Sequence, residues 1–198
     1  MADAAGQTCG AGAGLYERLV GEGWGGLDEP VRRFHARAGG AAARAAGTFA
    51  VRRGTGRAAC TLARLLGLPE AGEAVPLLLS VTPHGGGERW RRRFAGRDFV
   101  TEQHAHAGLL MAERVGPFEL LYRLTAEGGA LAYRQEAAAL CAGRLRLRLP
   151  RRLAPRVEAR ERAGEGGRGV RVSVRVTAPL VGLLIEYEGL VTTGGEAG

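Results

Sequence analysis

The spacing of hydrophobic residues changes near residue 73 and divides the chain into two parts. Before that point, apolar residues recur every three to four positions, as in amphipathic helices. The spacing predicts two short helices over residues 12–22 and 27–37, and a third over 57–67. A short alternating run over 48–53 predicts one strand between the second and third helices. The N-terminal third is therefore expected to be mainly helical.

Local signals support two of these helices. Asp28 is suited to the N-cap of the second helix, and Pro30 falls in its first turn. In the third helix, Leu62, Leu65 and Leu66 are predicted to share one apolar face. Each helix can therefore pack one side against a larger core.

From residue 73 onward, the period changes from 3.6 to 2, which is typical of strands with one buried face. Glycine-rich turns separate these runs, and no helical pattern lies between them, so parallel pairing is not expected. We predict an α+β, β-rich fold, in which short N-terminal helices precede a strongly curved antiparallel sheet or β-barrel of about ten strands. It forms one domain over residues 13–192, with flexible tails at 1–12 and 193–198. After the helices, the predicted strands cover 75–81, 89–94, 99–106, 109–115, 118–125, 131–141, 145–149, 170–176 and 183–187.

Composition narrows the class of protein. Of 198 residues, 45% are hydrophobic, which supports one core and argues against wholesale disorder. No uncharged apolar run approaches the roughly 20 residues of a transmembrane helix. Cys9, Cys60 and Cys141 are odd in number and far apart, which argues against a disulfide scaffold. Because the first residues also lack a signal-peptide pattern, we expect a cytoplasmic protein.

The positive charge is concentrated in two blocks. The net charge is +8, and all 28 basic residues are Arg, a bias that indicates a GC-rich genome rather than a function. Residues 89–97 sum to +5 and residues 144–162 to +6, so the rest of the chain sums to −3. Strand alternation sets the basic side chains opposite the apolar ones. The candidate patch residues are Arg89, Arg91, Arg93, Arg144, Arg146 and Arg148.

Two interpretations of these arginines remain open. In the first, the arginines lie on strand faces that are exposed to solvent and bind nothing. In the second, they bind an anionic membrane surface, a phosphorylated cofactor or an acidic partner protein. Nucleic acid is not expected as a partner, because RNA- and DNA-binding sheets interleave exposed aromatic residues with basic ones. Here Trp90 and Phe94 lie on the face opposite the outer arginines.

Several polar residues fall on faces that otherwise look buried. Glu113, Gln103 and Gln135 are in phase with apolar strand residues, and His35 lies on the apolar face of its helix. One interpretation is a ligand cavity inside the barrel with a few polar groups. The other is that Glu113 pairs with an Arg and the glutamines satisfy backbone groups. The candidate ligand-binding residues are Glu113, Gln103, His35, Trp90, Gln135 and Tyr133.

Motifs for metal or cofactor chemistry are weak or absent. His104 and His106 alternate on one strand face, but two ligands do not make a metal site, and no third is identifiable. The glycine-rich run at 10–14 follows no strand, so it is not a dinucleotide-binding fingerprint. We therefore predict no metal and no cofactor.

Seven motifs follow one another in order along the chain: LYERLVG (15–21), LDEPVRRFH (27–35), FAVRRGTGRAACTLARLLGLPEAGEAVPL (49–77), GGGERWRRRFAGRDFVTEQ (85–103), LLMAERVGPFEL (109–120), LPRRLAPRVEARE (149–161) and PLVGLLIEYEGLV (179–191). This order resembles a bacterial family known as domain of unknown function 4166. The resemblance extends from about Leu15 to Val191 and implies no established activity. In that family the domain occurs alone or after a saccharopine-dehydrogenase-like NAD(P)-binding domain, and this chain resembles the stand-alone form. The seven motifs carry the family pattern onto His35, Trp90, Phe94, Gln103, Glu113, Arg114, Gly116 and Pro117.

Three functions follow from these observations, in order of preference. The first is a binding module for a small apolar or amphipathic ligand such as a lipid, with Glu113, Gln103 and His35 orienting the polar end. The second, implied by the family resemblance, is an accessory domain that docks through its arginines on an NAD(P)-dependent oxidoreductase in trans. The third is an enzyme that uses Glu113 and His35 as an acid-base pair.

Overall fold

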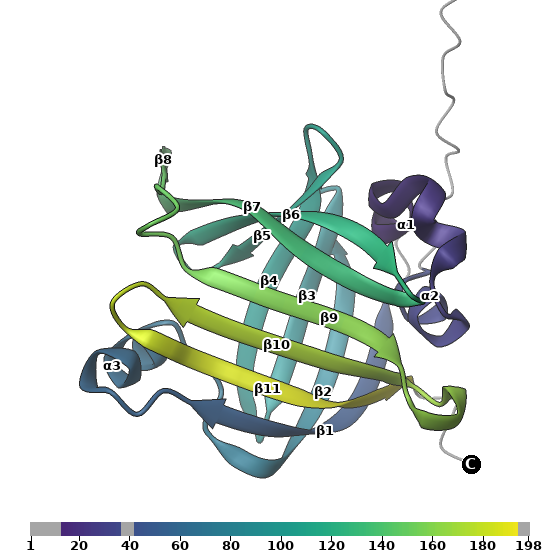
Figure 1. Cartoon of the computed structure of the whole chain (residues 1–198), viewed down its shortest axis with the longest axis horizontal. Helices are drawn as coiled ribbons and strands as arrows, with labels where there is room; N and C mark the ends of the chain where they lie inside the picture. The colour runs from purple at the N-terminus through teal and green to yellow at the C-terminus, as the bar shows by residue number, and fades with distance from the viewer. Residues whose placement is uncertain (1–12, 37–41, 194–198) are drawn as a thin grey trace, which may run out of the picture.

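A closed antiparallel β-barrel forms the body of the protein, with short helices at both ends (Figure 1). The structure is a computed structural model and describes residues 13–36 and 42–193. The predicted tails 1–12 and 193–198 lie outside that range, except for Thr193, which ends the last strand. The strands are β1 (Ala43–Arg53), β2 (Gly72–His84), β3 (Gly87–Phe94), β4 (Arg97–His106), β5 (Leu110–Val115), β6 (Phe118–Glu127), β7 (Ala130–Ala142), β8 (Leu145–Arg148), β9 (Arg156–Ala163), β10 (Val170–Ala178) and β11 (Gly182–Thr193).

Hairpin connections generate most of the barrel. Strands β1 to β6 each pair with the next, β1 also pairs with β11, and β11 continues through β10 and β9 to β7. The pairing of β6 with β7 closes a ring of ten strands, while β8 adds to one end of β7 outside the ring. This closure confirms the predicted barrel and leaves β8 as a short exposed edge. Strand β9, inside the second arginine block, was missing from the predicted set.

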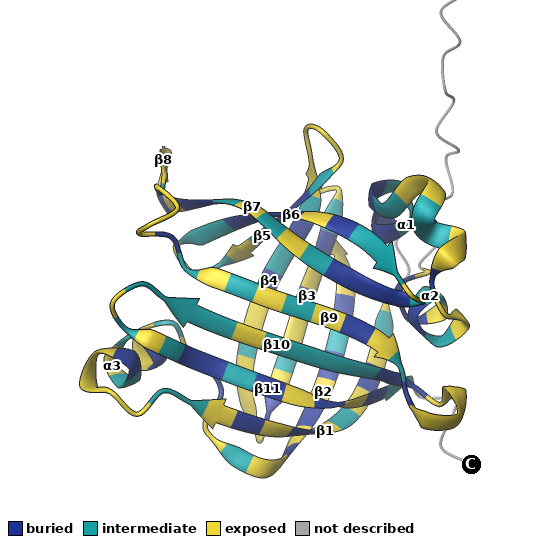
Figure 2. Ribbon diagram, in the orientation of Figure 1, coloured by how far each residue is buried: buried dark blue, intermediate teal, exposed yellow. Residues whose placement is uncertain are grey.

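Alternation of side chains explains why these segments form strands. In β2, Val75, Leu77, Leu79 and Val81 are buried, and the residues between them are more exposed. Figure 2 shows a similar alternation of buried and exposed positions along other strands, such as β1 and β11. The buried side chains of the ring point inward and form one core.

Two short helices close one end of the barrel. They are α1 (Leu15–Val20) and α2 (Glu29–His35), joined by the 3-10 helix η1 (Gly21–Gly26). Tyr16 and His35 are fully buried there against the aromatic ring of Trp90. None of the helices within residues 13–36 and 42–193 is long and apolar enough to cross a lipid bilayer.

The entry into α2 differs from the prediction in one detail. Asp28 occupies the N-cap position, but its side chain makes no capping hydrogen bond. Its backbone N–H instead donates to the carbonyl oxygen of Gly129 at 2.8 Å, in the turn between β6 and β7. The start of α2 is thus tied to the barrel rather than capped locally.

Helix α3 (Arg57–Leu65) lies at the opposite end of the barrel (Figure 1). The predicted leucine face is wrong at Leu65, which is 77% exposed. Ala59 and Ala63 form the buried side, and Leu62 and Leu66 are half-buried beside them. The small alanines let the helix approach the barrel wall closely.

Strand β8 is a second correction. The alternation of Leu and Arg predicted a buried leucine face, but Leu145 and Leu147 are 67% and 57% exposed. The strand pairs only with β7, at one end of it, so no opposite wall covers either face (Figure 1).

Candidate ligand-binding site

A cavity of about 310 Å³ lies inside the barrel. Phe34 of α2 lines one end of it, and Leu62 and Leu66 of α3 and its C-terminal turn line the other. Most of its wall is apolar, and its volume lies near the lower end of the range of small-ligand sites. The polar side chains on the wall are Arg92, Thr101, Gln103, Glu113, Tyr122, Tyr133, Glu161 and Tyr187.

The polar side chains gather toward the end closed by α1 and α2. Along β4 the cavity residues run Phe99, Thr101 and Gln103, and the last of these bonds to Tyr16 of α1. On β9 they run from Val157 to Glu161, which contacts α2. The cavity is therefore amphipathic along its length, apolar toward α3 and polar toward the helices at the closed end.

His35 and Glu161 form a buried pair at this polar end. The Nε2 atom of His35 lies 2.5 Å from Glu161 Oε2, and the Tyr133 hydroxyl donates to Oε1 at 2.8 Å. Burial alone raises the pKa of the Glu161 carboxyl, but His35 and Tyr133 more than offset it, so the net shift is downward. Glu161 is therefore a carboxylate whose two oxygens both have partners.

A second chain of contacts runs from α1 to β5. The Tyr16 hydroxyl donates to Gln103 Oε1 at 2.7 Å, and Gln103 Nε2 donates to Glu113 Oε1 at 3.0 Å. The hydroxyl oxygens of Tyr16 and Tyr133 lie 3.4 Å apart, which brings the two groups together. Residues from six separate elements thus meet in one polar cluster.

Arg92 reaches into the cavity from β3. Its Nη1 donates to Thr101 Oγ1 at 2.9 Å, and Nη2 lies 3.9 Å from Glu113 Oε1, beyond hydrogen-bond distance. The guanidinium also sits over the Trp90 ring, 5.1 Å from its centroid. Burial opposes the charged form, but Tyr187 and Glu113 keep the pKa of Arg92 above its usual value. Arg92 is therefore a fixed positive charge inside the barrel.

Trp90 connects the cavity wall with the helices. Its ring lies 6.0 Å from those of Tyr16 and Phe34, measured between centroids, and its Nε1 donates to Glu88 Oε2 at 2.9 Å. These contacts hold the indole in one orientation, so it forms a rigid part of the wall.

The structure brings together most of the predicted site residues. Gln103, Glu113, Trp90 and Tyr133 all line the cavity. His35 supports the polar end of the cavity from behind the wall, where its imidazole contacts Glu161 and not Glu113. Glu113 lies near an arginine, Arg92, as the alternative interpretation of that residue described.

Gln135 occupies a different place. Its Nε2 donates to the Pro155 carbonyl and its Oε1 accepts from the Val157 N–H, each at 2.8 Å. Strands β7 and β9 pair directly only over residues 131–133 and 159–161, so the amide bridges the gap beyond that pairing. Gln135 thus satisfies backbone groups, outside the cavity wall.

Five of the polar wall residues were not among the candidates: Arg92, Thr101, Tyr122, Glu161 and Tyr187. Glu161 is in phase with Val157 and Ala159, but it was counted only as an acid within the arginine block. Arg92 is in phase with Trp90, and that spacing could have identified it. Tyr122 gave no signal beyond its inward position on β6, because tyrosine is common in cores.

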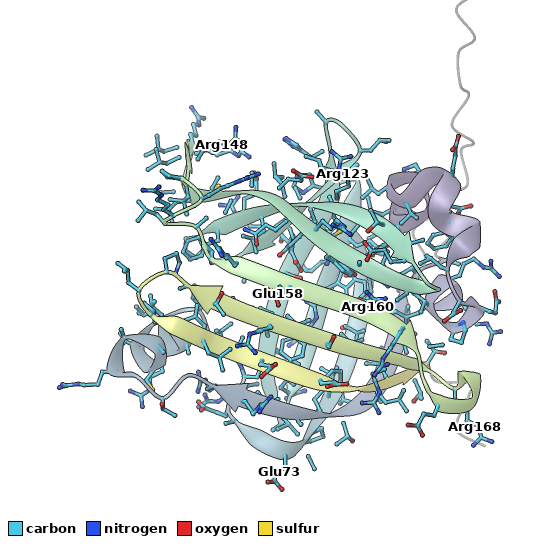
Figure 3. All side chains as sticks on the ribbon, in the orientation of Figure 1. Glu73, Arg123, Arg148, Glu158, Arg160 and Arg168 are labelled. Carbon is cyan, nitrogen blue, oxygen red and sulfur yellow. The ribbon has the colours of Figure 1, made fainter. Side chains whose placement is uncertain are left out.

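The outer arginines lie apart from this cavity. Arg89 pairs with Glu102 at 2.7 Å, and Arg91 with Asp98 of the neighbouring strand. Arg93 donates to the Gly96 carbonyl, and Arg146 pairs with Glu119 at 2.6 Å. The remaining two candidates, Arg144 and Arg148, are exposed near β8 and have no ion pair within the described part of the chain (Figure 3 labels Arg148).

The histidine pair of β4 lies on the outside. His104 is half-buried and His106 exposed, and both alternate with the inward residues of that strand. Over residues 13–36 and 42–193 no group of three or more His, Cys, Asp or Glu is arranged to hold a metal ion.

Comparisons with known proteins bear on the family. A family model described as "Domain of unknown function (DUF4166)" matches residues 27–191. No curated protein and no solved structure matches the chain. The matched segment begins just before α2 and ends within β11, so it contains the whole cavity wall. Because the match covers most of the chain, the protein belongs to the DUF4166 family of domains of unknown function.

Proposed function

We propose that the protein binds a small amphipathic ligand inside the barrel. The observation that carries this proposal is the gradient along the cavity, from the apolar side chains near α3 to the polar cluster near α1 and α2. The ligand's apolar part lies against residues such as Phe99 and Leu66, and its polar end lies at Arg92, Glu113 and Tyr122. Removal of the apolar part from water supplies most of the binding free energy.

The geometry supports binding better than acid-base catalysis by Glu113 and His35. His35 is fully buried, and its imidazole is engaged by Glu161. Glu113 accepts a hydrogen bond from Gln103 and belongs to the other chain of contacts. His35 and Glu113 each have a structural partner, and no hydrogen bond or ion pair joins them directly.

A cavity-filling substitution tests this proposal. Ala159 lines the cavity from β9, so Ala159→Phe places a ring in the ligand's space, and Ala159→Val provides a smaller step. We expect the wild-type protein to bind the apolar fluorophore N-phenyl-1-naphthylamine saturably, one per chain. Affinity should fall in the valine variant and be lost in the phenylalanine variant.

The cooperative unfolding of each variant serves as its folding control. Native mass spectrometry of the purified wild-type protein adds an independent test, because a retained natural ligand appears as a mass that denaturation releases. The proposal fails if the wild-type protein neither retains a ligand nor binds the fluorophore, or if folded Ala159→Phe binds the fluorophore as tightly as wild type.

A further inference from the structure

We propose that Arg92 and the Tyr122 hydroxyl bind a carboxylate, so that the ligand is an aliphatic monocarboxylate. This inference rests on the proposed function and specifies the head group. It follows from which hydrogen-bonding groups of the cavity are already engaged and which are not.

The acceptors at the polar end are largely occupied. Both oxygens of Glu161 have partners, His35 and Tyr133, and Glu113 Oε1 accepts from Gln103. Among the described residues, Glu113 Oε2 is the one carboxylate oxygen of this cluster without a hydrogen bond, and Glu113 lies 3.9 Å from the Arg92 guanidinium. That positive charge disfavours an ammonium group at the polar end.

The donors of Arg92 are largely free. A guanidinium carries five N–H donors in a planar fork, and Arg92 uses one in its hydrogen bond to Thr101. Glu113 lies 3.9 Å away, close enough to attract the charge but too far for a hydrogen bond. A fork of this kind matches the two oxygens of a carboxylate.

The Tyr122 hydroxyl is the second observation. Tyr122 lines the cavity and is 1% exposed, and its hydroxyl has no hydrogen-bond partner within the described residues. A buried unpaired hydroxyl is costly unless a ligand satisfies it. Burial raises the pKa of Tyr122, so the group remains a neutral phenol that can donate.

Arg92 and Tyr122 act on the same part of the cavity. Both line the same cavity and approach its polar cluster: Arg92 lies 3.9 Å from Glu113, and the Tyr122 ring packs against that of Tyr133, with 5.9 Å between centroids. The charge of Arg92 also opposes the effect of burial on the pKa of Tyr122. A carboxylate bound between Arg92 and Tyr122 would accept hydrogen bonds from the guanidinium and from the Tyr122 hydroxyl at the same time.

The charge of the site favours a carboxylate over a phosphate. Glu113 and Glu161 also line the cavity, so a second negative charge on the head group would meet two carboxylates. A single charge is balanced by Arg92. Glu113 then competes with the ligand for Arg92, which gives the proposal a distinctive signature.

Three ligands with a linear ten-carbon chain, which in decanoate includes the carboxyl carbon, test the head group. Decanoate is anionic, decanol is neutral and decyltrimethylammonium is cationic. By titration calorimetry at pH 7.5, we expect decanoate to bind roughly tenfold or more tightly than either of the others, as for a charge-assisted hydrogen bond. Arg92→Met should remove that preference and leave the decanol affinity within about twofold.

Two further variants separate recognition from a folding effect. Tyr122→Phe should weaken decanoate binding by roughly three- to tenfold and hardly change decanol binding. Glu113→Gln keeps an acceptor for Gln103 and removes the competing charge, so decanoate affinity should rise. Arg91→Met, on the outer face of the same strand, is the matched control and should change neither.

The outcomes distinguish the two proposals. If decanol or decyltrimethylammonium binds as tightly as decanoate, the head-group inference is overturned and the proposed function stands. The inference also fails if folded Arg92→Met or Tyr122→Phe keeps the full preference for decanoate. If no tail binds and N-phenyl-1-naphthylamine does not bind either, the proposed function itself fails.

Discussion

The polar residues of the barrel interior depend on partners far away in the sequence. His35 and Glu161 are 126 positions apart and reach each other only because α2 closes the end of the barrel near β9. An unpaired carboxylate at that depth would be strongly unfavourable. The pair therefore connects the stability of the fold with the shape of the polar end of the cavity.

Removal of His35 should reveal the cost of burying the Glu161 carboxylate without its partner. His35→Ala leaves Glu161 buried with only the Tyr133 hydroxyl, and we expect the free energy of unfolding to fall by about 3–5 kcal/mol in urea titrations. The double variant His35→Ala, Glu161→Gln should recover part of the loss. A single variant as stable as wild type would show that the pair is not needed.

Glu161 should also contribute to acid sensitivity. Its pKa in the folded protein lies below the ordinary value, so it binds a proton more readily when the chain is unfolded. Its contribution to stability is therefore present above the unfolded pKa of about 4.3 and is lost as pH falls through the lower folded value. Urea titrations between pH 7 and pH 3 should show a smaller decline for Glu161→Gln than for wild type. Equal slopes would contradict this assignment.

At the level of single residues, the sequence drew attention to polar side chains that interrupt an apolar run. Gln103 and Glu113 stood out in this way, and both line the cavity. Arg92 and Glu161 also interrupt apolar runs. Each lies within one of the two arginine blocks, so the sequence did not distinguish it from the neighbouring charged residues that point outward. The pairing of Glu161 with His35 could not be read at all, because it depends on how the helices dock.

At the scale of elements, the docking of α2 depends on one turn of the barrel. Leu27 forms an isolated bridge with Gly129, and the next residue, Asp28, donates to the same glycine's carbonyl. Gly129 has a φ of +80°, and a Cβ on it would lie 2.3 Å from the Asp28 carboxylate. A side chain there would be strained by the positive φ and would force the exposed Asp28 carboxylate to move.

Alanine substitutions in this turn should separate backbone strain from helix docking. Gly129→Ala combines a left-handed φ with the clash, whereas a Cβ on Gly128, also at positive φ, meets nothing within 4 Å. Each substitution should lower the free energy of unfolding by about 1–3 kcal/mol because of the left-handed φ, and Gly129→Ala should cost more because it must also displace the Asp28 carboxylate. Equal losses in urea titrations would mean that the Asp28 side chain moves aside without cost.

The hydrophobic periodicity predicted the positions of most helices and strands. It predicted less well which of their residues are exposed. Alternation in β2 identified its buried face correctly, because that strand has neighbours on both sides and a wall opposite. The same pattern in β8 failed, because it lies outside the closed ring. Burial therefore depends on what lies across from an element, which local sequence does not contain.

At the scale of the whole molecule, closure of the sheet separates two surfaces with different chemistry. The inner surface forms the core and the cavity, and the outer surface carries the arginine blocks. Arg89 and Arg91 pair with acids on the neighbouring strand β4, and Arg146 of β8 pairs with Glu119 of β6. Figure 3 shows Arg123 and Arg160 on this outer side, and each of them has an acidic partner. The alternation predicted a closed sheet, but which strands would meet depends on contacts between β6, β7 and β9.

This separation predicts different salt effects for the two surfaces. Exposed ion pairs are screened by salt and contribute little, so Arg91→Met should leave the urea midpoint unchanged within error at 0.15 M salt. Decanoate binding inside the barrel should depend only weakly on salt between 0.05 and 0.5 M, because buried charges are screened much less. A steep decline of decanoate affinity with salt would place the binding on the outer arginines.

The most direct test of ligand binding inside the barrel is a crystal structure of the protein grown with decanoate. The ligand's tail should lie along the apolar part of the cavity toward α3, with its carboxylate within hydrogen-bond distance of both Arg92 and the Tyr122 hydroxyl. A cavity filled by rearranged side chains, or decanoate bound only on the outside of the barrel, would contradict the account.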